Sequence, residues 1–402
     1  MYNLTDRNIV LGVSGSIAAY KAAALASKLT QAGSKVDVLL TPAAARFISP
    51  LTFQGVSGRP AFMDMFDIES GASELHIELA RRAHAFVIAP ATATTIARVA
   101  LGLAEDMVSL TALATRAPVV VCPAMDPQMF EHAATGGHLE TLRSRGVHVV
   151  GPEVGRLASG HVGPGRMSEV DTIIGAVRYV LGKDGDLAGK KVVVSAGGTQ
   201  EPIDPVRYIG NYSSGKMGYA VAEAARDRGA DVVLVSGRAT LAAPYAVRVV
   251  PVQRATEMRD AVVGACADAD AVIMAAAVAD YQPAEAVGQK IKRRQEELGL
   301  SLVRTPDVLA EVGRRPGLVR VGFAAESEDL VANARRKLEE KGLDLIAAND
   351  VTAEGSRFGS DTNRVTLLGR DGYEEELPLM SKYDVAGRIL DRIVGLLEAK
   401  AR

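Results

Sequence analysis

The stretch that organises this chain is SAGGTQEPIDPVRYIGNYSSGKMG, residues 195–218. It follows the apolar run KVVV (191–194) and precedes a helix-forming segment. A strand, a turn rich in glycine and hydroxyl groups, and a helix in succession are typical of the opening of a βαβ unit. A similar turn, GVSGSIAAYKA at residues 12–22, lies near the N-terminus. We therefore expect two α/β halves, each opening with a glycine turn.

Short apolar runs alternate with helix-period segments on both sides of this stretch, which predicts mainly parallel sheets. Residues 382–402 have the amphipathic pattern of a closing helix. The predicted fold class is α/β, with two Rossmann-like three-layer domains. The expected strands are 8–13, 35–41, 85–90, 118–124 and 147–152 in the first half, and 191–196, 230–237, 270–278, 318–325, 343–350 and 364–369 in the second.

The length of 402 residues also favours two domains, because single cores seldom grow that large. The segment LGKDGDLAGK (181–190) combines glycines with charges between the two series of strands. We therefore expect domains at 1–180 and 191–402, joined by a linker at 181–190.

The charge balance gives no reason to expect nucleic acid or a membrane as a partner. Lysine and arginine number 46 against 48 aspartates and glutamates, a net charge of -2. The two cysteines, Cys122 and Cys266, form no metal-binding pattern. The first residues lack the pattern of a signal peptide, and no apolar run is long enough to cross a bilayer. We expect a cytoplasmic protein.

Both glycine turns are candidate anion sites, because a helix N-terminus presents unpaired N–H groups and partial positive charge. Glycine also occurs in strand–helix turns only because it fits their backbone geometry, and for a single turn this explanation is as good as a phosphate site. The first turn does not match the G-x-G-x-x-G fingerprint, which argues against NAD. The residues concerned are Gly12, Gly15 and Ser16 in the first half, and Gly197 to Thr199 and Ser213 to Lys216 in the second.

Several sequence blocks, in order along nearly the whole chain, resemble a known pair of enzymes. The second half resembles phosphopantothenate–cysteine ligase, through the blocks DPVRYIGNYSSGKMG, AAAVADYQP, KIK, GFAAE and AANDV. The first half resembles the flavin-dependent phosphopantothenoylcysteine decarboxylases, through GVSGSIAAYK, HIELARRA, APATATTIARVALGLAEDMVS, PAM and GPGRM. The order is that of the fused bacterial enzyme of coenzyme A biosynthesis.

The resemblance implies that the second half ligates 4′-phosphopantothenate to L-cysteine with CTP and Mg²⁺, through an acyl-cytidylate. It implies that Asn211 holds this intermediate, that Lys290 assists its formation, and that Arg207 binds the phosphopantothenate end. Asp280 would contact the nucleotide and its metal ion. Without the resemblance, Lys337 and Lys341 would be read as a solvated surface pair. The CTP-binding positions implied are Met274, Ala275, Ala276, Asp280, Lys290, Thr305, Pro306, Asp307, Phe323, Lys337 and Lys341.

The same resemblance implies that the first half decarboxylates the product to 4′-phosphopantetheine, with FMN as cofactor. The flavin carries the redox chemistry, and the protein orients it. His76 would be the catalytic histidine, a residue suited to proton transfer near neutral pH. Asp126 and Met129 fall at substrate-binding positions, and Ser159 at a catalytic position. The FMN-binding positions implied are Gly15, Ser16, Ile17, Thr41, Pro90, Thr92 and Thr94.

Two residues depart from the family's pattern. The usual PAMN reads PAMD here, so that Asp126 replaces a substrate-binding asparagine. An ionised aspartate cannot donate a hydrogen bond, so Asp126 is protonated, contacts a donor, or binds substrate differently. Ser159 stands where many members have a proton-donating cysteine, which puts the final reduction in doubt. His161 is a candidate replacement as proton donor.

The family's flavin domains form trimers and its ligase domains form dimers, so we expect a homo-oligomer, up to a dodecamer. Two alternatives for the first half stay open at this point. It could be another FMN-dependent lyase or prenyltransferase, or a flavin-binding regulatory module without catalysis.

Overall fold

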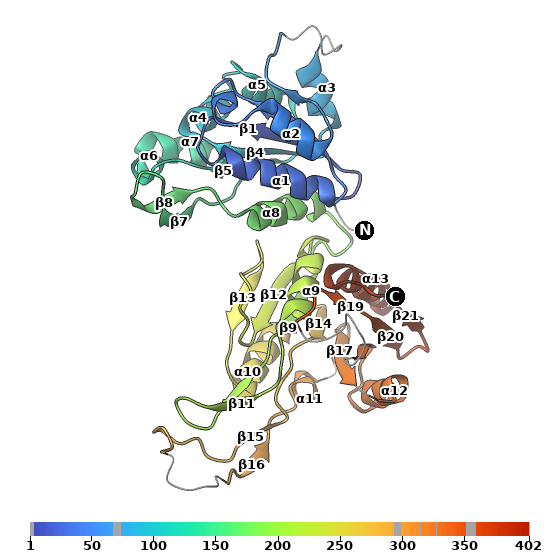
Figure 1. Ribbon diagram of the computed structural model, residues 1–402. Coiled ribbons are helices and arrows are strands. Elements are labelled where there is room, and N and C mark those ends of the chain that lie inside the picture. The colour runs from blue at the N-terminus through green and yellow to red at the C-terminus, as the bar shows by residue number, and fades with distance from the viewer. Residues whose placement is uncertain are drawn as a thin grey trace. The chain divides into compact units, whose positions relative to one another are not determined.

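The chain divides into two compact units, Met1–Gly182 and Lys183–Arg402. The computed structural model describes residues 4–66, 74–292, 299–313, 315–326, 328–350 and 359–401. In this part of the chain, no helix is both long and apolar enough to cross a membrane. Figure 1 shows the elements of each unit. The first two residues of the expected linker, 181–190, are the last of helix α8 (Val170–Gly182).

The first unit is built on a six-stranded sheet in which every strand pair is parallel. Helices α1 and α8 contact one another and the strands of this sheet, whereas α3 packs with α5, and α4 with α5 and α7. The sheet order is β3 (Ala61–Phe62), β2 (Lys35–Leu40), β1 (Asn8–Val13), β4 (Ala85–Ala91), β5 (Val119–Pro123) and β6 (His148–Val149). The other elements are α1 (Ala19–Gln31), η1 (Ala44–Arg46), α2 (Pro50–Ser57), α3 (Leu75–Arg82), α4 (Ala93–Leu101), α5 (Met107–Ala114), α6 (Pro127–Glu131), α7 (Ala133–Ser144) and the hairpin β7 (Glu153–Arg156) and β8 (Val162–Arg166).

The second unit is built on an eight-stranded sheet, parallel from β13 to β18 and antiparallel at β20 and β21. The sheet order is β13 (Arg248–Pro251), β12 (Asp231–Ser236), β9 (Lys191–Ala196), β14 (Ala271–Met274), β17 (Val319–Glu326), β18 (Leu345–Asp350), β20 (Val365–Gly369) and β21 (Glu374–Glu376). The helices are α9 (Lys216–Arg226), α10 (Ala255–Ala265), η3 (Cys266–Asp268), α11 (Val308–Val312), α12 (Leu330–Glu340) and α13 (Lys382–Ala401). Three two-stranded ribbons complete it: β10 (Gln200–Pro202) with β11 (Tyr208–Gly210), β15 (Tyr281–Pro283) with β16 (Leu302–Arg304), and β19 (Thr362–Asn363) with β22 (Met380–Ser381).

The strands of the second unit are apolar throughout because both faces of the sheet are covered. In β9, Val192 and Val194 belong to the core on the side of α9 and α13, whereas Val193 belongs to the core beneath α10 and α12. Successive side chains of a strand point to opposite faces, so a strand buried on both sides reads as a continuous apolar run. The predicted α/β class with mainly parallel sheets is confirmed.

The strand order places one switch point in each unit. In the first sheet β1 lies between β2 and β4, and in the second β9 lies between β12 and β14. Open α/β sheets bind ligands outside the carboxyl ends of the strands at such points. Both glycine turns of the sequence follow the strands concerned, β1 and β9.

Candidate functional site

The candidate FMN residues of the first unit lie at the carboxyl ends of three adjacent strands. Residues 15–17 follow β1, Thr41 follows β2, and Pro90 and Thr92 lie at the end of β4. Thr92 is the N-cap of α4, and its Oγ1 accepts a hydrogen bond from the Thr95 N–H. Thr94, in the first turn of α4, is exposed. The sheet therefore gathers all these positions at one edge.

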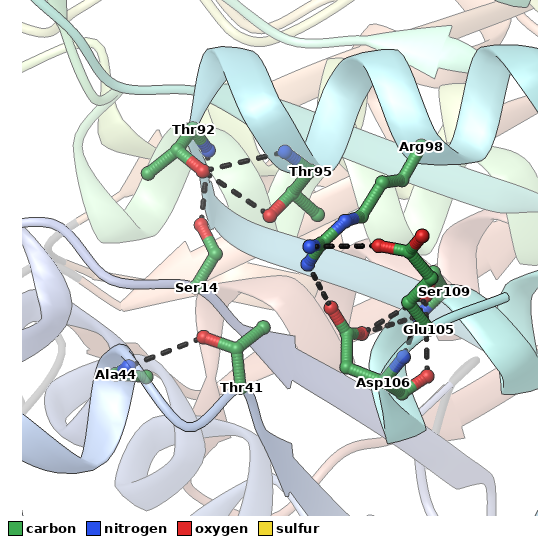
Figure 2. Close-up of polar contacts among 9 residues, drawn as sticks. All are labelled: Ser14, Thr41, Ala44, Thr92, Thr95, Arg98, Glu105, Asp106 and Ser109. Atoms are coloured by element: carbon green, nitrogen blue, oxygen red, sulfur yellow. Dashed lines mark hydrogen bonds and ion pairs between the residues drawn. The ribbon is translucent and has the colours of Figure 1, made fainter. Parts of the chain in front are cut away.

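Ser14, which the sequence analysis did not single out, joins two of these strand ends. Its buried Oγ donates to the Pro90 carbonyl at 2.7 Å. The same oxygen accepts from the Thr92 N–H at 2.9 Å, as Figure 2 shows. On the neighbouring strand, Thr41 Oγ1 accepts from Ala44 N at 3.1 Å. Ser14 thus fixes the loop that carries Pro90 and Thr92. Its place directly after an apolar strand, inside the glycine turn, was the available signal.

The first unit has a pocket of about 620 Å³, a size that suits a small-molecule ligand. Candidate residues Ser16, Ile17, Asp126 and Ser159 all line it. Met129, on α6, does not line this pocket and is 49% exposed. The remaining lining residues are Ala18, Tyr20, Lys21, Ala124, Met125, Arg156, Leu157, Ala158, Gly165, Arg166, Met167 and Glu169.

His76 is half-buried in the first turn of α3 and does not line this pocket. Helix α3 leads into β4, and a helix that connects parallel strands runs antiparallel to them. The first turn of α3 therefore lies toward the edge where the strands end. The structure places His76 toward this edge, and among the described residues no hydrogen bond or ion pair joins it to another candidate.

In the second unit, one pocket of about 580 Å³ gathers the candidate CTP-binding residues. All of them line it except Ala275 and Lys290. They come from β14, from the loop after it, from the turn before α11, and from β17 and α12. The members are Met274, Ala276, Asp280, Thr305, Pro306, Asp307, Phe323, Lys337 and Lys341.

Backbone hydrogen bonds hold the loop after β14 against the glycine turn after β9. The N–H groups of Ala275 and Ala276 donate to the carbonyl and hydroxyl oxygens of Ser195, and Ala279 N donates to Thr199 Oγ1 at 2.9 Å. Thr305 N donates to the Asp280 carbonyl at 3.0 Å. Because the Ala275 and Ala276 N–H groups are engaged, these residues would offer a bound base their carbonyl oxygens.

Lys337 of α12 and Lys341, the residue directly after this helix, both line the pocket. Lys337 Nζ donates to the Phe323 carbonyl at 2.9 Å, and Lys341 Nζ pairs with Asp307 Oδ2 at 2.9 Å. Burial opposes the ionisation of Asp307, but Lys341 and the N–H groups that begin α11 hold its pKa below the ordinary value. A spacing of four residues puts both lysines on one face of the helix.

A second pocket of about 520 Å³ adjoins the first and shares five lining residues with it: Ala276, Val278, Asp280, Phe323 and Lys337. It is lined by Asn211, the stretch 212–218, Ala275 and Lys382. Lys382 was not predicted. Burial lowers its pKa, the nearby charge of Lys216 acts in the same direction, and the carboxylate of Asp361 opposes them.

Asp204 links the two segments that carry Arg207 and Lys290. It is buried, and its Oδ1 accepts from the Val206 and Arg207 N–H groups at 2.8 Å. Its Oδ2 accepts from Ile291 N at 3.2 Å and lies 3.4 Å from Arg207 Nη1. Burial opposes its ionisation, but these donors hold its pKa below the ordinary value. Lys290 is exposed and lines neither pocket, although its neighbour Ile291 is anchored beside Arg207.

Asn211 points toward the loop after β14. Its Nδ2 donates to the Val278 carbonyl at 3.1 Å. Gly198 makes this approach possible, since a Cβ there would lie 2.9 Å from the Asn211 carbonyl oxygen. Across the described ranges, no cluster of three or more His, Cys, Asp or Glu side chains could hold a metal ion. Asp280 lines both pockets, and Asp307 is a second carboxylate in the first.

Two known protein families match this chain, one in each unit. The flavoprotein family model matches residues 1–182, and that of the DNA/pantothenate metabolism flavoprotein C-terminal domain matches 187–397. The coenzyme A biosynthesis bifunctional protein CoaBC of Bacillus subtilis is 45% identical over 397 residues, 98% of either chain. That of Escherichia coli K12 is 45% identical over 407 residues, 100% of either chain.

The chain belongs to the CoaBC family. Its predicted identity as a bifunctional enzyme acting in two steps of coenzyme A biosynthesis is confirmed by these full-length relatives. The prediction that the first half is a flavoprotein is confirmed as well. Relatives that match both halves do not favour an unrelated flavin-dependent lyase or a regulatory module.

Two solved structures are also similar to parts of the chain. The C-terminal domain of a CoaBC protein is 40% identical, with a TM-score of 0.47, and the match covers 54% of this chain and 99% of that one. A PPC decarboxylase mutant complexed with pantothenoylaminoethenethiol is 33% identical, with a TM-score of 0.40, and the match covers 43% and 97%.

Proposed function

We propose that residues 183–402 ligate 4′-phosphopantothenate to L-cysteine with CTP and Mg²⁺, and that residues 1–182 decarboxylate the product with FMN. The observation that carries the ligase assignment is the convergence of residues from five segments on two adjoining pockets. One pocket suits a nucleotide and the other suits an acyl and phosphate group. This proposal includes a homo-oligomeric state and a cytoplasmic location.

The first ligase step requires a carboxylate to attack the α-phosphorus of CTP and release pyrophosphate. Lys337 and Lys341 would face the nucleotide, and their charge favours phosphate oxygens. Mg²⁺ is commonly held by one or two carboxylates together with phosphates, a role that the carboxylate of Asp280 would fill. Lys290, in the segment anchored through Asp204, would stabilise charge that develops on the transferring phosphoryl group.

The second ligase step requires the amine of cysteine to attack the acyl carbon and release CMP. Asn211 borders the pocket that would hold the acyl-cytidylate, and it is fixed by its bond to Val278. The carbonyl oxygens of Ala275 and Ala276 can accept from the amino group of cytosine. Lys216, which pairs with Asp361, and Lys382 lie at this pocket and would donate hydrogen bonds to the phosphorylated end of the substrate.

The residues of the first unit fit a flavin mononucleotide. The pocket begins at Ser16 and Ile17, beside the N-terminus of α1, where a phosphate is favoured by N–H groups and helix charge. Ser14 holds the strand ends at which Thr92 and Pro90 would meet the flavin. When bound, FMN supplies the reversible two-electron oxidation that makes loss of carbon dioxide possible. His76 and Asp126 would orient the substrate.

The test is one incubation of the full chain, loaded with FMN, with 4′-phosphopantothenate, cysteine, CTP and Mg²⁺. We expect pyrophosphate and 4′-phosphopantetheine to form together, and CTP to outperform ATP. Lys290→Gln and Asn211→Asp should abolish ligation while leaving decarboxylation of supplied phosphopantothenoylcysteine intact. Normal ligation by both variants would overturn the ligase site. Size-exclusion chromatography with light scattering tests the oligomer.

A further inference from the structure

The second unit has a third cavity, which no step of the proposed reactions uses. It measures about 330 Å³ and lies at the carboxyl ends of β12 and β13, with residues of α9 and β10 completing its walls. None of its described lining residues also lines either ligase pocket. It is therefore a cavity distinct from the ligase site.

The segment after β12 separates this third cavity from the ligase pockets. In sheets with this strand order, a dinucleotide lies across the switch point and places its pyrophosphate on the glycine turn. Here Gly237 N donates to the Ala196 carbonyl at 2.8 Å, and Arg238 N donates to the Gly198 carbonyl at 3.2 Å. A Cβ at Gly197 would lie 3.0 Å from the Gly237 carbonyl oxygen. The backbone thus occupies the path of a pyrophosphate, and the crevice is divided into two halves.

Arg238 gives the third cavity a binding group for an anion. It lines the cavity, and its side chain is exposed. Among the residues that the structure describes, none forms an ion pair or a hydrogen bond with its guanidinium group. In dinucleotide-binding sheets, an arginine near the second strand accommodates a phosphate on the ribose. Because no described lining residue is acidic, a phosphate would meet no carboxylate here.

Gln200, on β10, supplies a second recognition group. It is only 8% exposed and lines the cavity, and its side-chain amide has no hydrogen-bond partner among the described residues. Buried amides normally form hydrogen bonds, so an unpartnered one in a cavity indicates a ligand that offers both a donor and an acceptor. A glutamine amide has the geometry to pair with N6 and N7 of adenine.

The remaining walls of the third cavity suit an aromatic ring. Val249 and Val252 are half-buried there and present apolar side chains. The hydroxyl groups of Tyr219 and Ser236 lie 3.1 Å apart and are engaged with each other. Ligand sites commonly combine such apolar walls with a few polar groups that fix orientation. A planar base could therefore pack against the valines while its edge faces Gln200.

We propose that the third cavity binds a phosphorylated adenosine. The phosphate binds Arg238, the base packs against Val249 and Val252, and the amide of Gln200 pairs with the edge of the base. The volume suits a mononucleotide. The nucleotide binds whether or not the ligase pockets are filled, because the two halves of the crevice share no lining residue. This site does not depend on which reaction the ligase pockets perform.

The test is isothermal titration calorimetry of the full chain with AMP, alone and with CTP and Mg²⁺ present in excess. We expect AMP to bind with the same Kd under both conditions. Arg238→Gln should weaken the affinity for AMP roughly 10- to 100-fold, because a charge-assisted hydrogen bond is lost. Arg248→Gln, exposed on β13 and outside the cavity, is the matched control and should bind AMP as the wild type does.

Gln200→Leu tests the recognition of the base. Removal of an unpartnered buried amide should leave the thermal midpoint unchanged or raise it, while the affinity for AMP falls roughly 10-fold. A Kd that is unchanged in both Arg238→Gln and Gln200→Leu would overturn the site.

Three further results would contradict the proposal. Displacement of AMP by CTP, or its loss in Lys337→Gln, would place AMP in the ligase pocket instead. Inorganic phosphate that binds as tightly as AMP would exclude recognition of the base. Absence of AMP binding at concentrations up to about 1 mM would exclude the site altogether.

Discussion

Asp204 illustrates how much of the ligase site depends on one buried carboxylate. It accepts N–H groups from both the segment of Arg207 and the segment of Lys290. Asp204→Asn keeps one acceptor oxygen but places an NH₂ group against N–H donors. We expect ligation to fall roughly 10- to 100-fold through misplacement of Lys290. Pyrophosphate release measures the loss, and unchanged decarboxylation of supplied phosphopantothenoylcysteine is the internal control. An unaffected ligation rate would contradict this positioning role.

The same carboxyl predicts a pH dependence of stability. The folded pKa of Asp204 lies below its ordinary value of 3.8, so its stabilisation is fully present above that value. It is lost as the pH falls through the folded pKa. The thermal midpoint of the second unit should therefore exceed that of Asp204→Asn near neutral pH, and the two midpoints should converge under strongly acidic conditions. Scanning calorimetry over this range measures the difference, and a constant difference would contradict it.

Lys337 and Arg336 are neighbours on α12 with different expected roles. Lys337 lines the nucleotide pocket, whereas the Arg336 side chain is 69% exposed and contacts Asn333. Loss of a charged hydrogen bond costs about 1.5–3 kcal/mol, so Lys337→Gln should raise KM for CTP roughly 10- to 100-fold. Arg336→Gln should leave it unchanged. Steady-state kinetics at saturating cysteine measures both, and equal effects would exclude a direct contact of Lys337 with CTP.

Residues such as these show where sequence reasoning stops. Spacing alone could not separate Lys337 from a solvated lysine, since the pocket is closed by segments from elsewhere in the chain. The resemblance supplied the candidate, and the fold brings it to the pocket. Asp204 and Ser14 were not predicted because each acts by forming hydrogen bonds with backbone groups that are distant in the sequence. Such contacts become visible only in the tertiary structure.

At the scale of elements, α9 approaches β9 unusually closely at Gly218. A Cβ there would lie 2.5 Å from Ala196 Cβ and 2.8 Å from the Ser195 carbonyl oxygen. Gly218→Ala should therefore push α9 and its N-terminal turn away from the strand. Overpacking of this kind costs about 1–3 kcal/mol. We expect a lower thermal midpoint and a weaker ligase activity.

The matched control for Gly218→Ala is Gly395→Ala on α13, where a Cβ would meet nothing within 4 Å. Alanine is favoured over glycine inside a helix by roughly 0.5–1 kcal/mol, so this variant should be slightly stabilised. Chemical denaturation of both variants measures the two changes. Destabilisation of both to the same extent would contradict the role of the close approach.

The hydrophobic pattern of the sequence predicts some helices and strands of this fold and misses others. Strands β1, β9 and β12 are apolar runs buried on both faces, and the sequence placed them directly. The ribbons β10–β11 and β15–β16 have strands of three residues, too short to show a period-2 pattern, and their burial ranges from mostly buried in β10 to exposed in β16. Their pairing depends on the turns between the strands and on neighbouring segments, and the β-propensity of single residues does not predict such effects.

At the scale of the whole molecule, each unit has a sheet, a core and a pocket of its own. The division at Gly182 separates two sets of contacts that resemble two independent domains. The sequence analysis placed a linker at residues 181–190, on the glycine-rich, charged stretch that precedes the restart of the strand pattern at Lys191. The sequence does not show how far the stability of one unit depends on that of the other.

This dependence can be measured by calorimetry of the full chain. We expect two thermal transitions, one for each unit. A ligand at about 100 times its Kd stabilises the folded state by about 2.7 kcal/mol, which raises the midpoint of a unit of this size by roughly 5–10 °C. CTP with Mg²⁺ should shift only one transition, and FMN only the other. Lys337→Gln should weaken the CTP shift and leave the FMN shift intact. A single transition that responds to both ligands would show that the two units unfold as one, and would contradict their independence.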